Sequence, residues 1–272
     1  MVNLIDKYCE MPAVVRKPMW KIWHKLMIKF DKNSDAVFMN YGYQSLNGDT
    51  PLELIEKDKI NRYCIQLYDF VVKKVDLKDK DLLEVGSGRG GGASYITRYF
   101  KPKSYTAVDI SSNVIKFCNN YHKVEGLKFI RGEAEKLPFI DGSFDVMVNV
   151  ESARGYSSLK TFFREVYRVL RHDGHFCFAD VIKKGEYEEV RNHLQENGFK
   201  IISEHEISKN VVRALDFDTE RRKTLITNKV PKFLVKPFLK FAATKGTERY
   251  EDFATGRMEY WSFVLQKNGQ LK

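Results

Sequence analysis

Cysteine is scarce in this sequence, and the few cysteines form no recurrent pattern. Cys9, Cys64, Cys118 and Cys177 are far apart, no C-x-x-C pair occurs, and the six histidines are scattered. Disulfide frameworks and zinc sites show characteristic cysteine or cysteine and histidine spacings. Neither is therefore predicted, and we expect no metal in the functional site.

Long apolar runs are also missing. No stretch reaches the roughly 18 consecutive apolar residues that a membrane-spanning helix needs. The first residues, M-V-N-L-I-D-K-Y-C-E, contain no apolar segment followed by a small-residue cleavage site. These absences predict a cytoplasmic protein.

Signatures of nucleic-acid enzymes are absent, although the net charge is +10. The sequence has no helix-turn-helix or RNA-binding signature, no N-P-P-Y or D-P-P-Y motif and no Pro-Cys nucleophile. Its charge lies at the ends: residues 1–30 hold six basic and two acidic residues, and residues 220–272 hold twelve and five. We predict no nucleic-acid partner and interpret the basic ends as solvated helices or as a peripheral contact with an anionic membrane.

The distinctive stretch is residues 81–92, D-L-L-E-V-G-S-G-R-G-G-G, where an apolar strand ends in glycines. Glycines this dense are costly in a strand or helix, so they predict a loop whose backbone approaches a ligand. Gly86, Gly88 and Gly91 satisfy G-x-G-x-x-G, and Asp109 lies 18 residues beyond Gly91. On these residues alone the ligand could be a dinucleotide.

Strand and helix signals alternate regularly after residue 81. The pattern predicts strands at residues 82–85, 104–108, 127–131, 144–150, 175–181, 199–204 and 258–266, and helices at 90–100, 112–121, 159–170 and 186–197. Repeated alternation of this kind is typical of α/β proteins with right-handed crossovers. We therefore predict a Rossmann-like, seven-stranded, mostly parallel sheet.

Two segments lie outside this alternation. Residues 1–75 predict an N-terminal helical cap, with a basic amphipathic helix after Pro18 and a longer helix from about 52 to 75. Residues 207–257 are basic and contain prolines, and they predict a helical insertion between the core, 76–206, and its final strand, 258–272. Aromatic residues of the two segments are predicted to form a lid over the substrate: Trp20, Trp23, Tyr41, Tyr43, Phe217 and Phe238.

Three features favour S-adenosylmethionine (SAM) as the cofactor. Glu84 precedes the first glycine by two residues, where a carboxylate can attract the cationic methionyl end of SAM through water or backbone. Glu133 follows the third strand and offers a carboxylate to the adenine amino group. Residues 141–152, D-G-S-F-D-V-M-V-N-V-E-S, end the fourth strand with polar groups where a methyl donor would point.

The order of these motifs, E-V-G-S-G-R-G-G, A-V-D-I-S, G-E-A-E-K-L-P-F and S-F-D-V-M-V-N-V-E-S, resembles the class I SAM-dependent methyltransferases. The stretches N-R-Y-C-I-Q-L-Y from Asn61 and Y-W-S-F-V-L-Q-K from Tyr260 are similar to small-molecule O-methyltransferases of the phthiotriolone dimycocerosate type. Sterol C-methyltransferases are more distant relatives. The resemblance covers roughly residues 38–206 and the last strand.

This resemblance implies roles for single residues in binding the cofactor. The glycine loop would admit SAM, Asp109 would take the ribose hydroxyls, and Glu133 with the Ala134 backbone would meet the adenine. Asp109 could instead cap the next helix, although Ser111 or Ser112 suits that role better. The predicted cofactor site comprises Glu84, Gly86, Ser87, Gly88, Gly90, Asp109, Ile110, Glu133, Ala134 and Asn149.

The chain departs from the family pattern at Arg154, where relatives usually have a histidine that could deprotonate a substrate hydroxyl. Arginine stays protonated and cannot act as that base. The base would then be Glu151, Asp180 or His175; alternatively, Arg154 holds a carboxylate that needs no base, or pairs with Glu151. By resemblance, Tyr156 lines the methyl-transfer pocket, which makes Glu151, Arg154 and Tyr156 the candidate catalytic residues.

The sequence thus predicts a SAM-dependent methyltransferase of a lipophilic small molecule, with transfer to oxygen favoured. One alternative is a sterol-like C-methyltransferase, in which Tyr41, Tyr43 and Glu151 would steady a carbocation. The other is a non-catalytic protein that binds SAM. The sequence defines neither the acceptor nor the oligomeric state.

Overall fold

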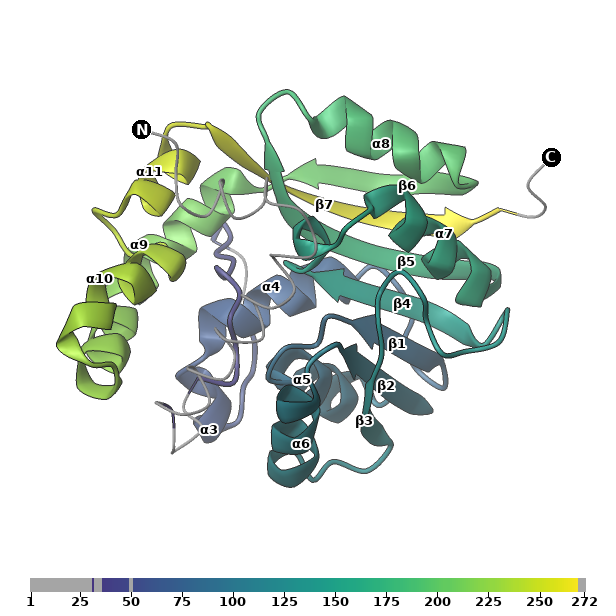
Figure 1. Ribbon diagram of the computed structural model, residues 1–272, viewed down its shortest axis with the longest axis horizontal. Helices are drawn as coiled ribbons and strands as arrows, with labels where there is room; N and C mark the ends of the chain where they lie inside the picture. The colour runs from purple at the N-terminus through teal and green to yellow at the C-terminus, as the bar shows by residue number, and fades with distance from the viewer. Residues whose placement is uncertain (1–30, 32–35, 49–50, 269–272) are drawn as a thin grey trace.

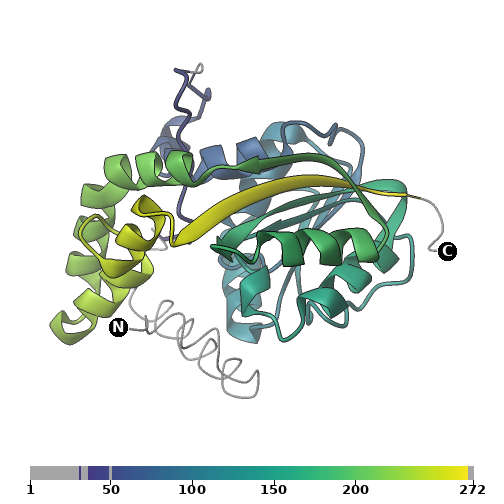
Figure 2. The ribbon, with the colours of Figure 1, turned by 90° about the horizontal axis from the view of Figure 1, so that it is seen from above.

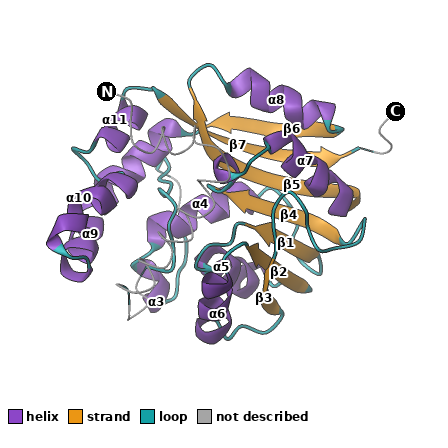
Figure 3. Ribbon diagram, viewed as in Figure 1, coloured by secondary structure: helices purple, strands orange, loops and turns teal. Residues whose placement is uncertain are grey.

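The structure is a computed structural model that describes residues 31, 36–48 and 51–268 of the 272-residue chain. The helix expected after Pro18, with Trp20 and Trp23, lies outside the described residues. A seven-stranded sheet forms the centre of the molecule (Figures 1 and 3). Its strands are β1 (Asp81–Val85), β2 (Ser104–Asp109), β3 (Leu127–Arg131), β4 (Phe144–Val150), β5 (Leu170–Lys183), β6 (Phe199–Glu206) and β7 (Met258–Lys267).

The strands are arranged in the order β3-β2-β1-β4-β5-β7-β6. All neighbours from β3 to β5 are parallel, and β7 runs antiparallel to both β5 and β6. The predicted seven-stranded, mostly parallel sheet is therefore confirmed. The strand order reverses between β1 and β4, and at such a point a crevice opens beyond the carboxyl ends of the strands.

Helices cover both faces of the sheet because successive side chains of a strand point to opposite sides. Leu82 and Ala107 belong to an apolar cluster on the face that carries α4, α5 and α6. Leu83 and Val108, their neighbours in the chain, belong to the cluster under α7 and α8. These helices are α4 (Arg62–Val72), α5 (Gly91–Phe100), α6 (Ser112–Tyr121), α7 (Leu159–Val169) and α8 (Tyr187–Glu196).

The prediction of a single helix from about residue 52 to 75 was wrong, because the chain forms two helices there. A short α3 (Glu56–Lys59) precedes α4, and Asn61 between them has a non-helical backbone. The cause is a tertiary contact: the buried carboxylate of Asp58 accepts hydrogen bonds from Arg98, at 2.7 Å, and from the Tyr99 hydroxyl, at 2.8 Å. Both partners belong to α5, so α3 is fastened to α5 rather than continuing into α4.

The segment between β6 and β7 folds into three helices, α9 (Ser208–Lys229), α10 (Lys232–Phe241) and α11 (Glu248–Ala254). They pack on one another beyond one end of the sheet, at the left in Figures 1 and 2. Arg222 of α9 ties them to residues 36–48, which we call the strap: its buried Nη2 donates to the backbone oxygens of Asn40, at 3.1 Å, and Tyr41, at 3.0 Å. In the part of the chain that the structure describes, no helix is both long and apolar enough to cross a membrane.

Glu84 of β1 is a charged residue inside the core. Its carboxylate accepts hydrogen bonds from the hydroxyls of Tyr68, at 2.9 Å, and Tyr105, at 3.1 Å. Burial raises the pKa of Glu84 to about 7, although the two hydrogen bonds act in the opposite direction. A glutamate in water has a pKa of about 4.5, which serves as the reference for the unfolded chain.

Replacing Glu84 with glutamine is therefore expected to change how stability depends on pH. An acid whose folded-state pKa is raised costs stability as pH rises from its unfolded to its folded pKa, here by about 3 kcal/mol above pH 7. The difference in unfolding free energy between Glu84→Gln and the parent, measured by urea titration, should therefore shift in favour of the variant by about that amount as pH rises from about 4.5 to 8. Glu165→Gln is the control: Arg168 lowers the pKa of Glu165, so no gain is expected. A parallel pH dependence of Glu84→Gln and the parent would contradict the prediction.

Candidate active site

A cavity of about 340 Å³ opens beyond the carboxyl ends of β1, β2 and β4, where the strand order reverses. The segments that follow β1, β2, β3 and β4 form its sheet side, and the strap and α10 form the opposite side. Of the residues predicted for the site, the cavity wall contains Gly86, Ser87, Gly88, Asp109, Ile110, Ala134, Glu151, Arg154, Tyr156 and Tyr41.

The glycine loop is shaped by hydrogen bonds to β2 and by close contacts with the end of β4. The Gly86 amide donates to the Val108 oxygen at 2.8 Å, and its φ of +78° is a left-handed conformation that favours glycine. A Cβ on Gly86 would lie 2.1 Å from Ser152 Oγ, so no side chain fits there. Ser87 Oγ is buried and has no hydrogen-bond partner among the described residues, which suits it to a ligand in the cavity.

Asp109 ends β2 and faces the glycine loop. Its Oδ2 accepts a hydrogen bond from the Gly88 amide at 3.2 Å, and its Oδ1 accepts one from the Ser111 amide at 2.9 Å. Ser111, not Asp109, caps α6, because its side chain accepts from the Val114 amide. Burial raises the pKa of Asp109 to about 6, and the carboxylate remains available to a ligand that offers hydroxyl donors.

A polar network supports the cavity floor at the end of β4. The Asn149 amide donates to Ser152 Oγ at 2.8 Å and to the Tyr156 hydroxyl at 3.1 Å, and these two hydroxyls are 2.7 Å apart. The same amide donates to the oxygen of Val85 at 2.8 Å, which joins the network to β1. Burial raises the pKa of Tyr156, so its hydroxyl stays protonated and acts as a hydrogen-bond donor rather than a base.

Glu151 follows β4 and joins three parts of the molecule. Its Oε1 accepts hydrogen bonds from the Tyr41 amide of the strap, at 2.8 Å, and from the Tyr260 hydroxyl of β7, at 2.9 Å. Its φ of +54° is unfavourable for a residue with a side chain. Burial raises the pKa of Glu151 to about 7, against the effects of its hydrogen bonds and of Arg154.

Arg154 belongs to the short helix η1 (Ala153–Gly155) and forms its ion pair with Asp180 of β5, at 3.9 Å. Its Nη2 donates to the Tyr41 hydroxyl at 3.2 Å. The Arg154 backbone amide also donates to Asp180, at 3.3 Å. Asp180 and His175, two of the candidate bases, do not line the cavity.

Other predicted site residues lie outside the cavity wall. Glu84 is inside the core, Glu133 is exposed, Gly90 is the N-cap of α5 and Asn149 lies behind the wall. Of the predicted lid residues, Tyr43 stacks on Phe70, and Phe217 is 53% exposed and stacks on Tyr63. Phe238 lines a smaller neighbouring pocket.

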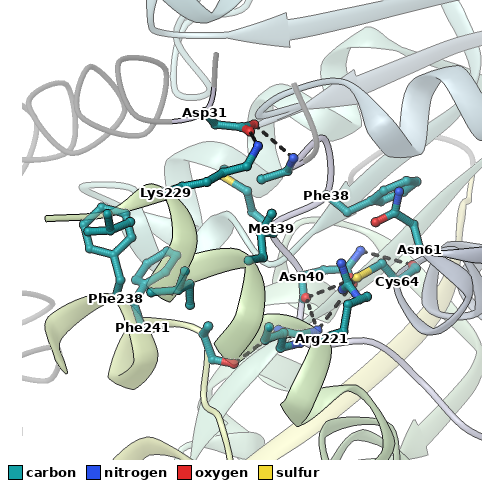
Figure 4. A pocket seen from close by; sticks show the side chains of 16 residues that line it. Asp31, Phe38, Met39, Asn40, Asn61, Cys64, Arg221, Lys229, Phe238 and Phe241 are labelled. Carbon is teal, nitrogen blue, oxygen red and sulfur yellow. Dashed lines mark hydrogen bonds and ion pairs between the residues drawn. The ribbon is translucent and has the colours of Figure 1, made fainter. Parts of the chain in front are cut away.

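That smaller pocket, of about 90 Å³, lies between the strap and the helices α9 and α10 (Figure 4). It shares Phe38, Met39, Asn40 and Phe241 with the main cavity. In Figure 4, Phe238 and Phe241 lie on the α10 side, and Asn40 and Arg221 lie across from them. The two spaces thus adjoin along the strap.

Further wall residues come from the two segments that were predicted to form the lid. Met39 of the strap and Pro237, Lys240 and Phe241 of α10 line the cavity, but they come from segments outside the alternating strands and helices. Arg249, whose side chain is fully buried, donates from Nε to the Tyr41 hydroxyl at 3.3 Å and was not predicted. No sequence pattern marks Arg249, because it reaches Tyr41 only through the packing of the insertion against the strap.

The sheet order, the glycine loop and the acidic end of β2 define a class I SAM-dependent methyltransferase. The chain matches the family described as methyltransferase domain over residues 83–178. It is 36% identical over 254 residues to the phthiotriol/phenolphthiotriol dimycocerosates methyltransferase of Mycobacterium tuberculosis, covering 93% of each chain. It is also 36% identical to the fatty-acid O-methyltransferase of Mycolicibacterium smegmatis, over 87% of this chain and 85% of that one.

The chain therefore belongs to this methyltransferase family, and it is an enzyme rather than a non-catalytic SAM-binding protein. Solved structures share the fold at low sequence identity. A cyclopropane synthase of Mycobacterium tuberculosis has a TM-score of 0.70 at 14% identity and covers 90% of this chain and 95% of its own. The geranyl diphosphate C-methyltransferase of Streptomyces coelicolor has a TM-score of 0.64 at 16% identity, and the match covers 89% of this chain and 97% of that one.

Proposed function

We propose that this enzyme transfers a methyl group from SAM to an oxygen atom, hydroxyl or carboxylate, of a lipophilic small molecule. The observation that carries the proposal is that one cavity joins six of the ten predicted cofactor residues to Glu151, Arg154 and Tyr156. The names of two relatives support the choice of acceptor: one acts on phthiotriol dimycocerosates and one is a fatty-acid O-methyltransferase.

The residues on the sheet side of the cavity fit SAM. Gly86 lines the cavity and lets Ser152 and Tyr156 pack against the loop, and the buried Ser87 hydroxyl offers a ligand a hydrogen bond. Asp109 can accept both hydroxyls of a ribose. Ile110 and Ala134 provide apolar contacts for an adenine, and bound SAM would supply an electrophilic methyl group to the acceptor.

The opposite side of the cavity fits a lipophilic acceptor with one polar group. Phe38, Met39 and Phe241 line it with apolar surface, whereas Arg154 and Glu151 lie at the end of β4. Methyl transfer is a displacement that needs mainly positioning and exclusion of water, which an apolar lid provides. In this proposal the enzyme works in the cytoplasm and takes its acceptor from a membrane, a role that the basic ends of the chain would support.

Two measurements test this function. Titration calorimetry should detect S-adenosylhomocysteine binding in roughly the micromolar range usual for enzyme ligands. Isotopically labelled methyl from SAM should then appear on oxygen when the enzyme is given palmitate or hexadecanol, with the product identified by mass spectrometry. No binding of S-adenosylhomocysteine, or no label on the oxygen of either compound, would contradict the proposal; label transferred to a carbon of oleate, an unsaturated acceptor tested in parallel, would support the C-methyltransferase alternative.

A further inference from the structure

Tyr41 holds an unusual position between two arginines. Its hydroxyl oxygen accepts one hydrogen bond from Arg154 Nη2, at 3.2 Å, and one from Arg249 Nε, at 3.3 Å. Tyr41 is 3% exposed and lines the main cavity. The two arginines come from η1 and α11, so three distant segments converge on this one oxygen atom.

Two guanidinium donors on one phenol oxygen limit what that oxygen can do. A phenol has one proton to donate and two lone pairs to accept hydrogen bonds. Arg154 and Arg249 occupy the accepting positions, and neither can lose its own proton in a protein. Such charge-assisted hydrogen bonds stabilise the ionised oxygen more than the neutral one. The third direction belongs to the phenol's own proton, and Tyr41 is one of the residues that line the cavity.

The surroundings of Arg249 strengthen this argument. Its side chain is fully buried, and its Nη1 forms an ion pair with Asp252 at 4.0 Å. A buried guanidinium is costly unless negative charge compensates it. A negative charge on Tyr41, which is closer to Arg249 than Asp252 is, would add to that compensation.

The other groups around Tyr41 hold it in place or oppose its ionisation. The backbone amide of Tyr41 donates a hydrogen bond to Glu151, and its backbone oxygen accepts one from Arg222 of α9. The ring of Phe253, in α11, packs against the Tyr41 ring, with 5.0 Å between the ring centres. Asp180 of β5 and Tyr260 of β7 face Arg154 and Glu151 respectively. Burial raises the pKa of Tyr41 and the Glu151 charge raises it further, but Arg249 and Arg154 more than offset both and bring it below that of free tyrosine.

We propose that Tyr41, as a phenolate between Arg154 and Arg249, is the general base when the acceptor is a hydroxyl. The proposal rests on the methyl-transfer function proposed above. The acceptor O–H bond breaks and its proton moves to the Tyr41 oxygen. The acceptor oxygen bonds to the methyl carbon while the carbon–sulfur bond breaks, and its electron pair stays on sulfur. The products are a methyl ether, S-adenosylhomocysteine and neutral Tyr41, which returns its proton to solvent.

This assignment gives the site a base for hydroxyl acceptors although Arg154 cannot act as one. Arg154 cannot accept a proton, but it contacts the residue that can, and so it acts as a positioning residue. A carboxylate acceptor is already ionised at neutral pH and has no proton to lose. Tyr41 is therefore needed for hydroxyl acceptors and not for carboxylates.

The test compares Tyr41→Phe with the control Tyr63→Phe. Tyr63 stacks on Phe217 and does not line the cavity, so loss of its hydroxyl should change no activity. For hexadecanol, Tyr41→Phe should lower kcat by about 100-fold or more, the usual contribution of a general base. Methylation of palmitate and the affinity for S-adenosylhomocysteine should each change by less than about threefold, a factor within about 0.7 kcal/mol.

A second measurement needs no acceptor. Near-ultraviolet absorbance follows tyrosine ionisation, and the difference between the parent and Tyr41→Phe should titrate below the usual pKa of about 10. A difference that titrates only at or above that pH, equal losses with hexadecanol and palmitate, or a parent enzyme that methylates palmitate alone would each overturn the role of Tyr41. A parent that methylates neither compound contradicts the proposed function instead, while the titration still decides whether Tyr41 ionises.

Discussion

Gly86→Ala is expected to weaken binding of S-adenosylhomocysteine by about 100-fold or more, which corresponds to roughly 3 kcal/mol. The added Cβ would lie 2.1 Å from Ser152 Oγ, 2.5 Å from Ser152 Cβ and 2.8 Å from the Tyr156 hydroxyl. Ser152 and Tyr156 are hydrogen-bonded to each other and to Asn149, so moving one disturbs the whole network. The displaced side chains would enter the space that we assign to the cofactor. Titration calorimetry measures the loss.

The control for Gly86→Ala separates this clash from backbone strain. Gly142 has a φ of +62°, similar to the +78° of Gly86, but a Cβ there would meet nothing within 4 Å. Gly142→Ala should therefore cost about 1 kcal/mol of stability through strain alone and leave ligand affinity unchanged. Equal affinities for the parent and Gly86→Ala would show that the cofactor does not approach this part of the loop.

The sheet could be predicted closely from the sequence because its signals are local. The β3 and β4 strands, at Leu127–Arg131 and Phe144–Val150, and the α6 helix, at Ser112–Tyr121, have the predicted bounds. Each combines a period in its apolar residues with turn or cap residues nearby, and both signals lie within a few positions of the element. The helix predicted from about 52 to 75 failed for the opposite reason, since Asp58 bonds to residues 40 and 41 positions away.

The candidate site likewise contains residues that could be predicted from the sequence and contacts that could not. Gly86, Ser87 and Asp109 could be predicted because they lie at strand ends, where parallel strands bring their following loops together. The contact between Tyr41 and Arg249 joins residues 208 positions apart, and no periodic pattern links them. Glu84 shows a related limit: its place in β1 was predicted, but the tyrosines that enclose it come from α4 and β2. The sequence alone therefore could not reveal whether its carboxylate faces the core or a ligand.

Glu151→Ala is expected to lower kcat by about 100-fold with either acceptor, a loss that 1 Å of misplacement can cause. The substitution removes the acceptor for the Tyr41 amide and the Tyr260 hydroxyl, and with it a link between the strap and the end of β4. Because the side-chain hydrogen bonds of Glu151 go to Tyr41 and Tyr260 and not to Asp109 or Gly86, affinity for S-adenosylhomocysteine should change by less than about threefold. Steady-state kinetics with palmitate and hexadecanol, together with calorimetry, measure both effects.

Two further substitutions of Glu151 distinguish a role in positioning the strap from a role in the stability of the fold. Glu151→Gln keeps an oxygen that can accept both hydrogen bonds, so it should recover most of the lost kcat. Glu151→Gly relieves the strain of the +54° φ and should be about 1 kcal/mol more stable than Glu151→Ala, yet no more active. If activity instead rose with stability across Ala, Gly and Gln, Glu151 would serve the fold alone. If Gln were as inactive as Ala, the carboxylate charge itself, and not the position of the strap, would be what the reaction needs.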